Sequence, residues 1–276
     1  MTIPSRTTNR TLFSQRVVAS LRDPLSLTLI IVVAYILLFF YTPILMSIGE
    51  VLLRGGISRD IVINSIPIAI RSLIISLVAT GICISIAIPL SYLLSFYTTP
   101  LEKTIFIILI LAPYWVGSLL KIYSLAYLLL VIENIIGKRI LYTETSLYIG
   151  LIYNYSPLAL IPIFLSMERV ERAVVEIARS LGGGSFYILR RVIIPMSSPG
   201  ITTAFFLVFT STIGEMIVPQ VLLGSSRYMI GQWIYQLMFS FRRLSDASLI
   251  SILYLILTLL ILILISRKGG LRGFSI

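Results

Sequence analysis

The chain has 276 residues, of which 58% are hydrophobic and only 12% are charged, and its mean hydropathy is +1.02. A soluble globular domain is about 25% charged, so this composition indicates an integral membrane protein. The net charge of +11 is explained by basic loops beside membrane spans. We therefore expect a lipid bilayer, and no nucleic acid, as a partner.

Residues 1–24 are polar and basic and predict a cytoplasmic N-terminus. The apolar run at 25–48 is long enough to cross a bilayer, and an outer loop follows it up to residue 66. Residues 67–266 then form the predicted transport core, and residues 267–276 form a cytoplasmic C-terminus. Further spans are predicted at 68–96, 104–132, 146–166, 199–221 and 248–265. The chain is therefore expected to be all-α, with six transmembrane helices.

Between the last two of these spans, residues 222–246 are less regular and carry aromatic side chains. They predict a short re-entrant or interfacial helix rather than a full span. The basic residues support this topology, because thirteen of the 22 lysines and arginines fall on the predicted inner side. These are Arg6, Arg10, Arg16, Arg22, Lys103, Arg169, Arg172, Arg179, Arg190, Arg191, Arg267, Lys268 and Arg272.

The segment at 168–195, between the fourth and fifth spans, is charged and broken by glycine. Its apolar residues recur at helical spacing, which predicts an amphipathic helix. Three consecutive glycines at 182–184 then break the helix, a second short helix is predicted at 185–193, and Pro195 is expected to end it. The apolar positions of the first helix are Val170, Val174, Ile177 and Leu181.

The pattern Glu176-Ile-Ala-x-x-x-Gly182, followed by Val-x-Ile-Pro195, resembles the EAA loop of binding-protein-dependent ABC importer permeases. In that family this loop docks into a separate ATPase subunit. The resemblance implies a type I importer fold with cytoplasmic coupling helices, and we name residues 168–195 the coupling segment. Ile177 departs from the usual Glu-Ala-Ala, and the extra glycines predict a looser break. The implied coupling residues are Glu176, Ala178, Arg179, Gly182 and Pro195.

Two further stretches are similar to the first permease of spermidine/putrescine importers. They are Ala112-Pro-Tyr-Trp-Val-Gly-Ser-Leu-Leu-Lys-Ile-Tyr-Ser124 and Ile213-Gly-Glu-Met-Ile-Val-Pro-Gln-Val-Leu-Leu-Gly224. This resemblance implies a polyamine permease that works with a second homologous permease, an ATPase dimer and an extracellular binding protein. The chain itself would be no enzyme, since ATP is bound by the partner subunit, and a P-loop sequence is absent here.

Charged residues inside the predicted spans indicate a substrate path. Glu215 and Lys121 lie at similar depth, about 24 Å and about 26 Å along their spans from the cytoplasmic end. Glu215 could attract a cationic substrate, with Tyr114, Trp115 and Tyr123 offering cation–π faces. Alternatively, Glu215 and Lys121 pair with each other, Lys121 extends to the outer interface, and the aromatic residues are interface anchors.

Other functions stay open at this point. A related permease for an anion such as sulfate or molybdate, or for ferric iron, is the nearest alternative. A secondary transporter, a channel or a membrane scaffold is a more distant one, and the first helix of the coupling segment could instead lie on the membrane surface. Histidine is absent and Cys83 is the only cysteine, so we expect no metal site, no catalytic residues and no cofactor.

Overall fold

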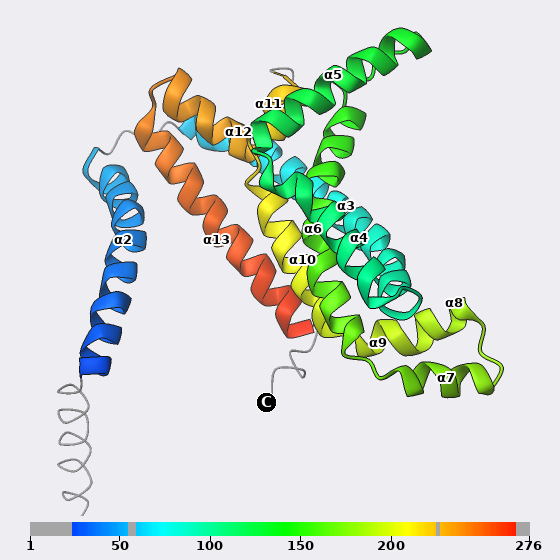
Figure 1. Cartoon of the computed structure of the whole chain (residues 1–276). Helices are drawn as coiled ribbons and strands as arrows, with labels where there is room; N and C mark the ends of the chain where they lie inside the picture. Colours follow the sequence, from blue (N-terminus) through cyan, green and yellow to red (C-terminus); the bar gives the residue numbers. More distant parts are fainter. Residues whose placement is uncertain (1–23, 55–58, 225–226, 269–276) are drawn as a thin grey trace, which may run out of the picture. The chain divides into compact units, whose positions relative to one another are not determined.

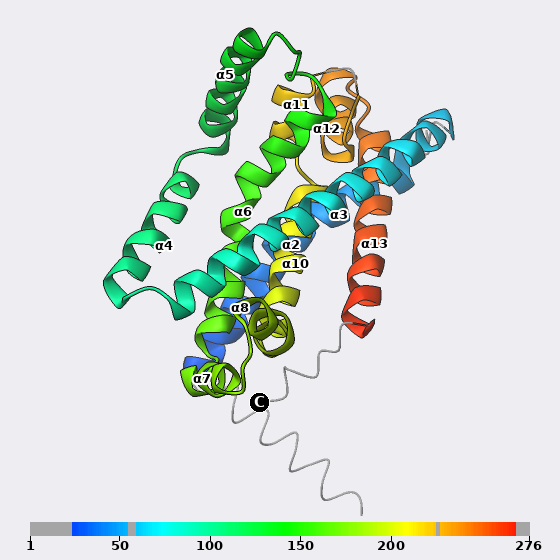
Figure 2. The same cartoon turned by 90° about the vertical axis from the view of Figure 1, so that its right-hand side faces the viewer.

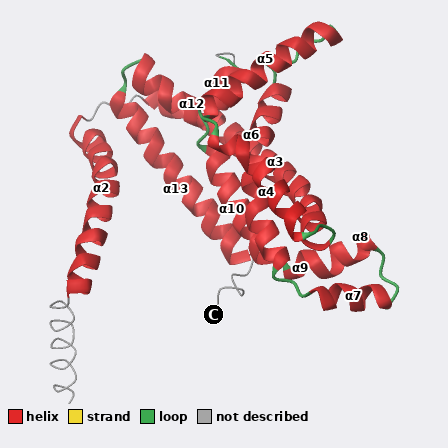
Figure 3. Cartoon of the chain, in the orientation of Figure 1, coloured by secondary structure: helices red, strands yellow, loops and turns green. Residues whose placement is uncertain are grey.

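The computed structural model describes residues 24–54, 59–224 and 227–268 (Figure 1). Within these ranges the chain forms helices and loops and contains no strand (Figure 3). The predicted all-α class is therefore confirmed. The two predicted tails, 1–24 and 267–276, lie almost wholly outside the described residues. The chain divides into two compact units, Met1–Gly56 and Ile57–Ile276.

The first unit contains helix α2 (Pro24–Arg54), which corresponds to the first predicted span. The helix continues past Pro43, which lies in its interior. Pro43 has no N–H to donate to the Phe39 carbonyl one turn before it, and such a proline is tolerated in a membrane helix. Apolar side chains such as Leu38 and Met46 are exposed, which suits a helix surrounded by lipid or by another subunit.

The second unit is built on three helices that pack against each other: α3 (Arg59–Phe96), α6 (Glu144–Glu168) and α10 (Ser198–Ile213). Small residues on α3 explain this close packing. Ala79, Cys83 and Ala87 recur every four residues, lie on one face and are fully buried. Small side chains let membrane helices approach closely, and Cys83 is thus a small buried apolar residue, as its sequence context indicates.

The third predicted span is wrong as one continuous helix. The structure has α4 (Pro100–Trp115) and α5 (Ser118–Ile136), separated by an extended Val116 and by Gly117. Pro113 lacks the N–H that would hold the last turn of α4, so the helix is weakest there. The depth that we estimated for Lys121 along a single helix is therefore also wrong.

The fifth predicted span is also shorter than expected, because α10 ends at Ile213 and residues 214–216 form a break. A short helix, α11 (Ile217–Leu222), follows this break. The irregular stretch after it contains α12 (Ile230–Tyr235) and a π-helical turn, η2 (Gln236–Ser240). The last helix is α13 (Leu244–Lys268).

The coupling segment forms a helix–turn–helix, as predicted. It contains α7 (Arg172–Ser180), α8 (Ser185–Ile188), the π-helical turn η1 (Leu189–Ile193) and α9 (Ile194–Met196). Pro195 does not end the second helix, which continues to Met196. The wide π turn closes with a bond from the Ile194 N–H to the Leu189 carbonyl, so Pro195 enters a new first helical turn, where its missing N–H costs little.

Five described helices are long and apolar enough to cross a membrane, and the number is six if Ser185–Met196 and Ser198–Ile213, bent by 75°, count as one span. The two views show α7 and α8 at one end of the second unit and α11 and α12 at the other (Figures 1 and 2). The coupling segment and the α11–α12 region therefore face opposite ends of the same bundle.

Candidate transport site and coupling segment

The break at residues 214–216 is organised by Glu215. One carboxylate oxygen, Oε1, accepts the backbone N–H groups of Met216 at 3.0 Å, Ile217 at 2.8 Å and Val218 at 3.3 Å. These N–H groups belong to the start of α11. The first N–H groups of a helix have no acceptor within the helix, and the helix dipole favours negative charge there. Glu215 is thus a helix cap at a break, and its predicted position inside a continuous helix is wrong.

The second carboxylate oxygen of Glu215 accepts the hydroxyl of Tyr155, which comes from α6. Both side chains are buried, with 9% of Glu215 and 8% of Tyr155 exposed. Tyr155 is not among the residues predicted from the sequence. The available signal was the polar pair Asn154-Tyr155 within a predicted span, because buried polar groups in a membrane need partners.

Neighbouring helices close around this break. A Cβ atom on Gly231 of α12 would lie 2.5 Å from the Gly214 carbonyl oxygen and 2.9 Å from the Glu215 carbonyl oxygen, so only glycine fits there. From α13, the Tyr254 hydroxyl donates to the Ile213 carbonyl at 3.3 Å. Backbone groups freed by the break thus find partners inside the protein, as a membrane interior requires.

Lys121 lies near this region but does not pair with Glu215. Its Nζ donates to Asn154 Oδ1 at 2.8 Å and lies 5.0 Å from the centre of the Tyr114 ring. No ion pair joins Lys121 and Glu215 among the described residues. Both alternatives for Lys121, pairing and extension to the interface, are wrong, because the buried amine is held by α6.

The five predicted path residues are only partly brought together. The Lys121 ammonium lies over the Tyr114 ring and donates to Asn154. Glu215 accepts a hydrogen bond from Tyr155, the residue that follows Asn154 on α6. Trp115 and Tyr123 are instead 80% and 60% exposed. The polar part of the candidate site is therefore a chain from α4 and α5 through α6 to the break, with two aromatic rings on the surface.

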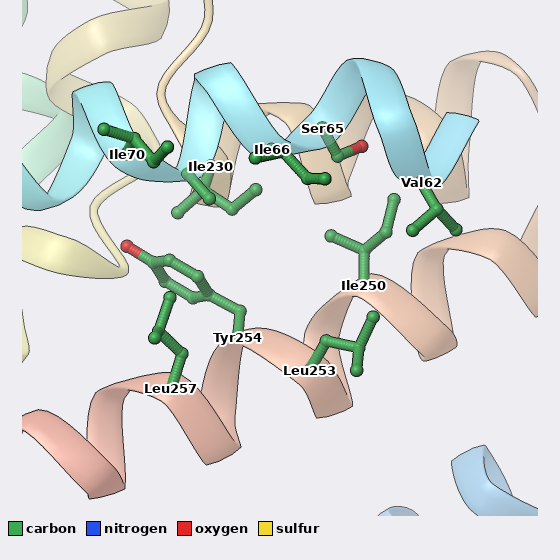
Figure 4. A pocket seen from close by; sticks show the side chains of 10 residues that line it. Val62, Ser65, Ile66, Ile70, Ile230, Ile250, Leu253, Tyr254 and Leu257 are labelled. Carbon is green, nitrogen blue, oxygen red and sulfur yellow. The ribbon is translucent and has the colours of Figure 1, made fainter. Parts of the chain in front are cut away.

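A hollow of about 170 Å³ lies between α3 and α13 (Figure 4). Its polar atoms are already used. The Ser65 hydroxyl donates to the Ile61 carbonyl at 2.7 Å and accepts the Trp233 Nε1–H at 2.8 Å, and the Tyr254 hydroxyl is bonded to Ile213. The rest of the lining is aliphatic, so this hollow suits apolar chains rather than a polar substrate.

At the other end of the bundle, the turn of the coupling segment is fixed by two backbone bonds. The Gly183 N–H donates to the Ala178 carbonyl at 3.0 Å, and the Gly182 N–H donates to the Arg179 carbonyl at 2.9 Å. This is a Schellman motif, with Gly182 at φ +84°. The prediction of a looser break is wrong: a Cβ on Gly183 would lie 2.7 Å from the Ala178 carbonyl oxygen, so the second glycine tightens the turn.

The coupling segment leaves apolar side chains exposed. Of the four positions that predicted its apolar face, Val170 is buried, but Ile177 and Leu181 are 61% and 83% exposed. Val175 instead contacts the protein core. After the turn, Phe186 and Tyr187 are also exposed. Glu176 and Pro195 are exposed as well. The segment therefore covers its own core with one side and presents an apolar surface on another.

Arg179 points to its own chain. Its Nη2 donates to the Tyr97 hydroxyl at 2.5 Å, and its guanidinium carbon lies 5.2 Å from the Tyr97 ring centre. The Tyr97 hydroxyl also lies 3.4 Å from the hydroxyls of Ser185 and Tyr92. Ser185 first, then Tyr92 and Arg179, lower the pKa of Tyr97. Tyr97, which the sequence analysis missed, thus joins the end of α3 to both helices of the coupling segment.

A second contact also joins the coupling segment to the transmembrane helices. Lys103 Nζ, near the start of α4, lies 2.6 Å from Glu168 Oε1 at the end of α6. The same ammonium lies 5.8 Å from the centre of the Phe164 ring. The α3–α4 turn is therefore held at two points, to α6 and to the coupling segment.

Comparisons with known proteins agree with this architecture. No family model matches the chain. The chain is 31% identical over 175 residues to the spermidine/putrescine transport system permease protein PotB of Haemophilus influenzae, a match that covers 59% of this chain and 61% of that protein. It is 26% identical over 230 residues to the PotB protein of Escherichia coli strain K12, covering 75% and 83% of the two chains. The Haemophilus match thus spans less than two thirds of that relative's length.

Solved structures show the same fold. A bacterial ABC transporter involved in the import of the acidic polysaccharide alginate matches with a TM-score of 0.69 and 15% identity, covering 95% of this chain and all of that chain. A second alginate transporter structure, in complex with an alginate pentasaccharide-bound periplasmic protein, matches with a TM-score of 0.70 and 16% identity over 88% and 94% of the two chains.

The chain is therefore a multi-pass membrane protein with the fold of ABC importer permeases. More particularly, its sequence is similar to that of spermidine/putrescine permeases. Both resemblances that the sequence motifs indicated are confirmed.

Proposed function

We propose that this chain is a transmembrane permease subunit of an ABC importer that takes up polyamines such as spermidine and putrescine. An extracellular binding protein would deliver the substrate, and a separate ATPase dimer would supply the energy. The observation that carries the proposal is the similarity to spermidine/putrescine permeases over most of the chain, together with the exposed helix–turn–helix at 168–195. The chain itself would break no covalent bond.

The coupling segment would dock into the ATPase through its exposed side chains. Ile177, Leu181 and Phe186 form an apolar surface on short helices, the kind of surface that fits a groove on a partner. Glu176 and Pro195 are exposed beside it, while Ala178 and Gly182 hold the turn. Arg179 would transmit a movement of the coupling segment to the transmembrane helices, because it donates a hydrogen bond to Tyr97 at the end of α3.

A second, homologous permease would complete the membrane part of the importer. The exposed apolar side chains of α2 and α13 suit burial against such a subunit or against lipid. The periplasmic protein that accompanies the related alginate transporter supports a binding protein as the third kind of partner. We propose the transport core at 67–266, preceded by the span and outer loop at 25–66.

Both termini would lie in the cytoplasm. The thirteen lysines and arginines counted above favour this orientation through the positive-inside rule. It also places the coupling segment on the side where ATP is available. The α11–α12 end of the second unit would then face the binding protein (Figures 1 and 2).

The substrate path would pass the break at residues 214–216. Broken helices near the middle of a span are common at the substrate sites of transporters. Glu215 would act as a fixed negative charge that favours a cation in a medium of low dielectric constant. Tyr114, Trp115 and Tyr123 would offer ring faces to that cation, and Lys121 would hold Tyr114 and α6 in place.

Reconstitution tests this proposal. The chain is assembled in proteoliposomes with its second permease, ATPase and binding protein, and ATP-dependent uptake of labelled spermidine, putrescine, sulfate, molybdate and ferric iron is measured. We expect uptake of the two polyamines and tight binding of one of them to the binding protein. Uptake of an anion or of iron instead would overturn the substrate, and no uptake with every partner present would favour a scaffold.

A further inference from the structure

A surface cavity of about 700 Å³ is lined by residues of α3, of the start of α6 and of the segment before α12. Its wall is aliphatic and comes from α3, with Ile70 and Ile74 among the lining residues. Its mouth is charged and aromatic. The charged lining residues are Arg71 of α3, Glu144 at the start of α6 and Arg227. An apolar wall beside a charged mouth fits an amphiphilic ligand.

The charges at the mouth do not balance. Glu144 Oε1 accepts Arg71 Nη2 at 3.3 Å and Arg227 Nη1 at 2.8 Å, so one carboxylate serves two guanidinium groups. Arg71 Nη1 also donates to the Tyr228 carbonyl at 3.2 Å. The side chains of Arg71 and Arg227 are 24% and 65% exposed, which leaves donors available to an outside ligand. Two positive charges against one negative charge favour an anion.

The cavity lies at the level of a membrane interface. Glu144 is the first residue of α6, a helix long enough to cross the bilayer, so the mouth is at the end of a span. Tyr148 and Tyr228 line the cavity, and the Tyr228 ring lies 5.3 Å from the Trp233 ring. Tyrosine and tryptophan gather at the depth of lipid headgroups. On the topology proposed above, this interface is the outer one.

The aliphatic wall belongs to a longer stripe on α3. The stripe residues recur at spacings of three and four and are each more than half exposed. On a membrane-spanning helix, such a stripe faces hydrocarbon chains. The residues are Ile70, Ile74 and Leu77.

We propose that this cavity binds an anionic phospholipid. The phosphate group would contact Arg71 and Arg227, and an acyl chain would lie along the stripe on α3. Glu144 competes for the same two guanidinium groups, so it weakens the site. This assigns a lipid-binding role that goes beyond the proposed transport function, and only its side of the membrane rests on that proposal.

Tryptophan fluorescence gives a direct test. The chain has two tryptophans, so in a Trp115→Phe background Trp233 is the single reporter, and it lies beside the cavity through Tyr228. The full chain is reconstituted in bilayers that contain brominated phosphatidylglycerol or brominated phosphatidylcholine, whose bromines quench nearby indoles. We expect phosphatidylglycerol to associate several times more strongly at equal mole fraction.

Three substitutions sharpen the test. Arg71→Gln and Arg227→Gln should each weaken the preference for phosphatidylglycerol about fivefold, the usual contribution of one basic side chain near an anionic surface. Glu144→Gln should strengthen it, because it frees both arginines. Arg139→Gln is the matched control, since this exposed arginine lies on the α5–α6 loop and does not line the cavity, and it should change nothing.

Equal quenching by the two lipids, or a Glu144→Gln protein with unchanged preference, would overturn the proposal. Competition by inorganic phosphate at millimolar concentration would identify a site for a soluble anion instead of a lipid. If Arg71→Gln kept the lipid preference but lost binding of the extracellular binding protein or of the second permease, the cavity would be a protein interface.

Discussion

The break at residues 214–216 and the turn at 182–184 both interrupt helices at glycine, but they differ in what surrounds them. At the break, both carboxylate oxygens of Glu215 are used, and α12 and α13 close around the backbone. At the turn, backbone bonds fix the geometry just as firmly, but the neighbouring side chains Leu181 and Phe186 are 83% and 74% exposed.

This difference separates two uses of a helix interruption. The break is complete within one chain, because a polar group left unpaired in a membrane costs several kcal/mol. At the turn, the backbone is hydrogen-bonded but apolar side chains remain exposed, which suits a segment that binds another protein. Substitutions in the two regions should therefore fail in different ways: at the break through stability, and at the turn through coupling.

The largest effect is expected at Glu215. Glu215→Ala removes the acceptor of three N–H groups and leaves the Tyr155 hydroxyl without its partner. Each unpaired buried group costs about 1–3 kcal/mol, so we expect a loss of about 3 kcal/mol or more and a clear fall in Tm in detergent.

Glu215→Gln is the matched variant. Its amide oxygen can still accept the N–H groups, and its amide nitrogen can donate to Tyr155 Oη, so most of the stability should return. If the charge attracts the substrate, spermidine uptake should still fall in this variant. Stable protein with wild-type uptake would show that Glu215 is a cap alone.

Gly182→Val tests the turn. A β-branched residue at φ +84° is strained by about 1–2 kcal/mol or more, and the Schellman motif would be lost. We expect ATP-driven uptake to fall at least tenfold while the Tm of the transmembrane part stays near that of the wild type.

Gly184→Ala is the control for this prediction. Gly184 has an ordinary φ of −69° and no atom near its Cβ position, so its replacement should leave uptake almost unchanged. A Gly182→Val protein with full coupled uptake would contradict the role of the coupling segment.

Tyr97→Phe should have a smaller effect. It keeps the ring under Arg179 but removes the hydroxyl that Arg179 and Ser185 contact, a loss of about 1 kcal/mol. We expect uptake to fall about threefold, with the ATPase still bound.

The lowered pKa of Tyr97 adds a pH dependence to this prediction. A group whose pKa is lower in the folded protein adds stability above its unfolded pKa and loses it as the pH falls through the folded pKa. The contact should thus strengthen as the pH rises toward about 10, which protection of Phe186 and Tyr187 from chymotrypsin would measure. Protection that rises equally in Tyr97→Phe would contradict this.

The smallest effect is expected for Lys103→Gln. This substitution removes an ion pair with Glu168, whose side chain is 42% exposed, and such pairs contribute about 0.2–1 kcal/mol. Tm should fall slightly and uptake should change less than in Tyr97→Phe. A larger loss of uptake than in Tyr97→Phe would place the main link between α4 and the coupling segment at Lys103.

Much of the architecture was predictable, because apolar runs report directly on membrane burial. The helix–turn–helix of the coupling segment also followed from its glycines and its helical spacing. The helical spacing of apolar residues does not show which of them are buried in the chain's own core. Val175 is buried while Ile177 and Leu181 are exposed. The sequence does not distinguish these positions, because contact with the core and contact with a partner both favour apolar residues.

The candidate site was less predictable for a related reason. Hydropathy treats the runs at 104–132 and 199–221 as uniform, although a helix can stop within such a run wherever side chains satisfy the backbone. The charge of Glu215 marks it as important, but its burial at the break depends on Tyr155 and Gly231, which are distant in sequence. Only the packing of α6 and α12 reveals it.

The length of α3 has one more consequence. Its 38 residues make a helix about 57 Å long, whereas the hydrocarbon core of a bilayer is about 30 Å thick. The helix must therefore tilt steeply or project beyond the hydrocarbon, and a change of acyl-chain length would alter that tilt. Because α3 ends beside Tyr97, a change in the tilt of α3 would also move the contact between Tyr97 and the coupling segment. The thickness of the membrane would therefore affect this contact.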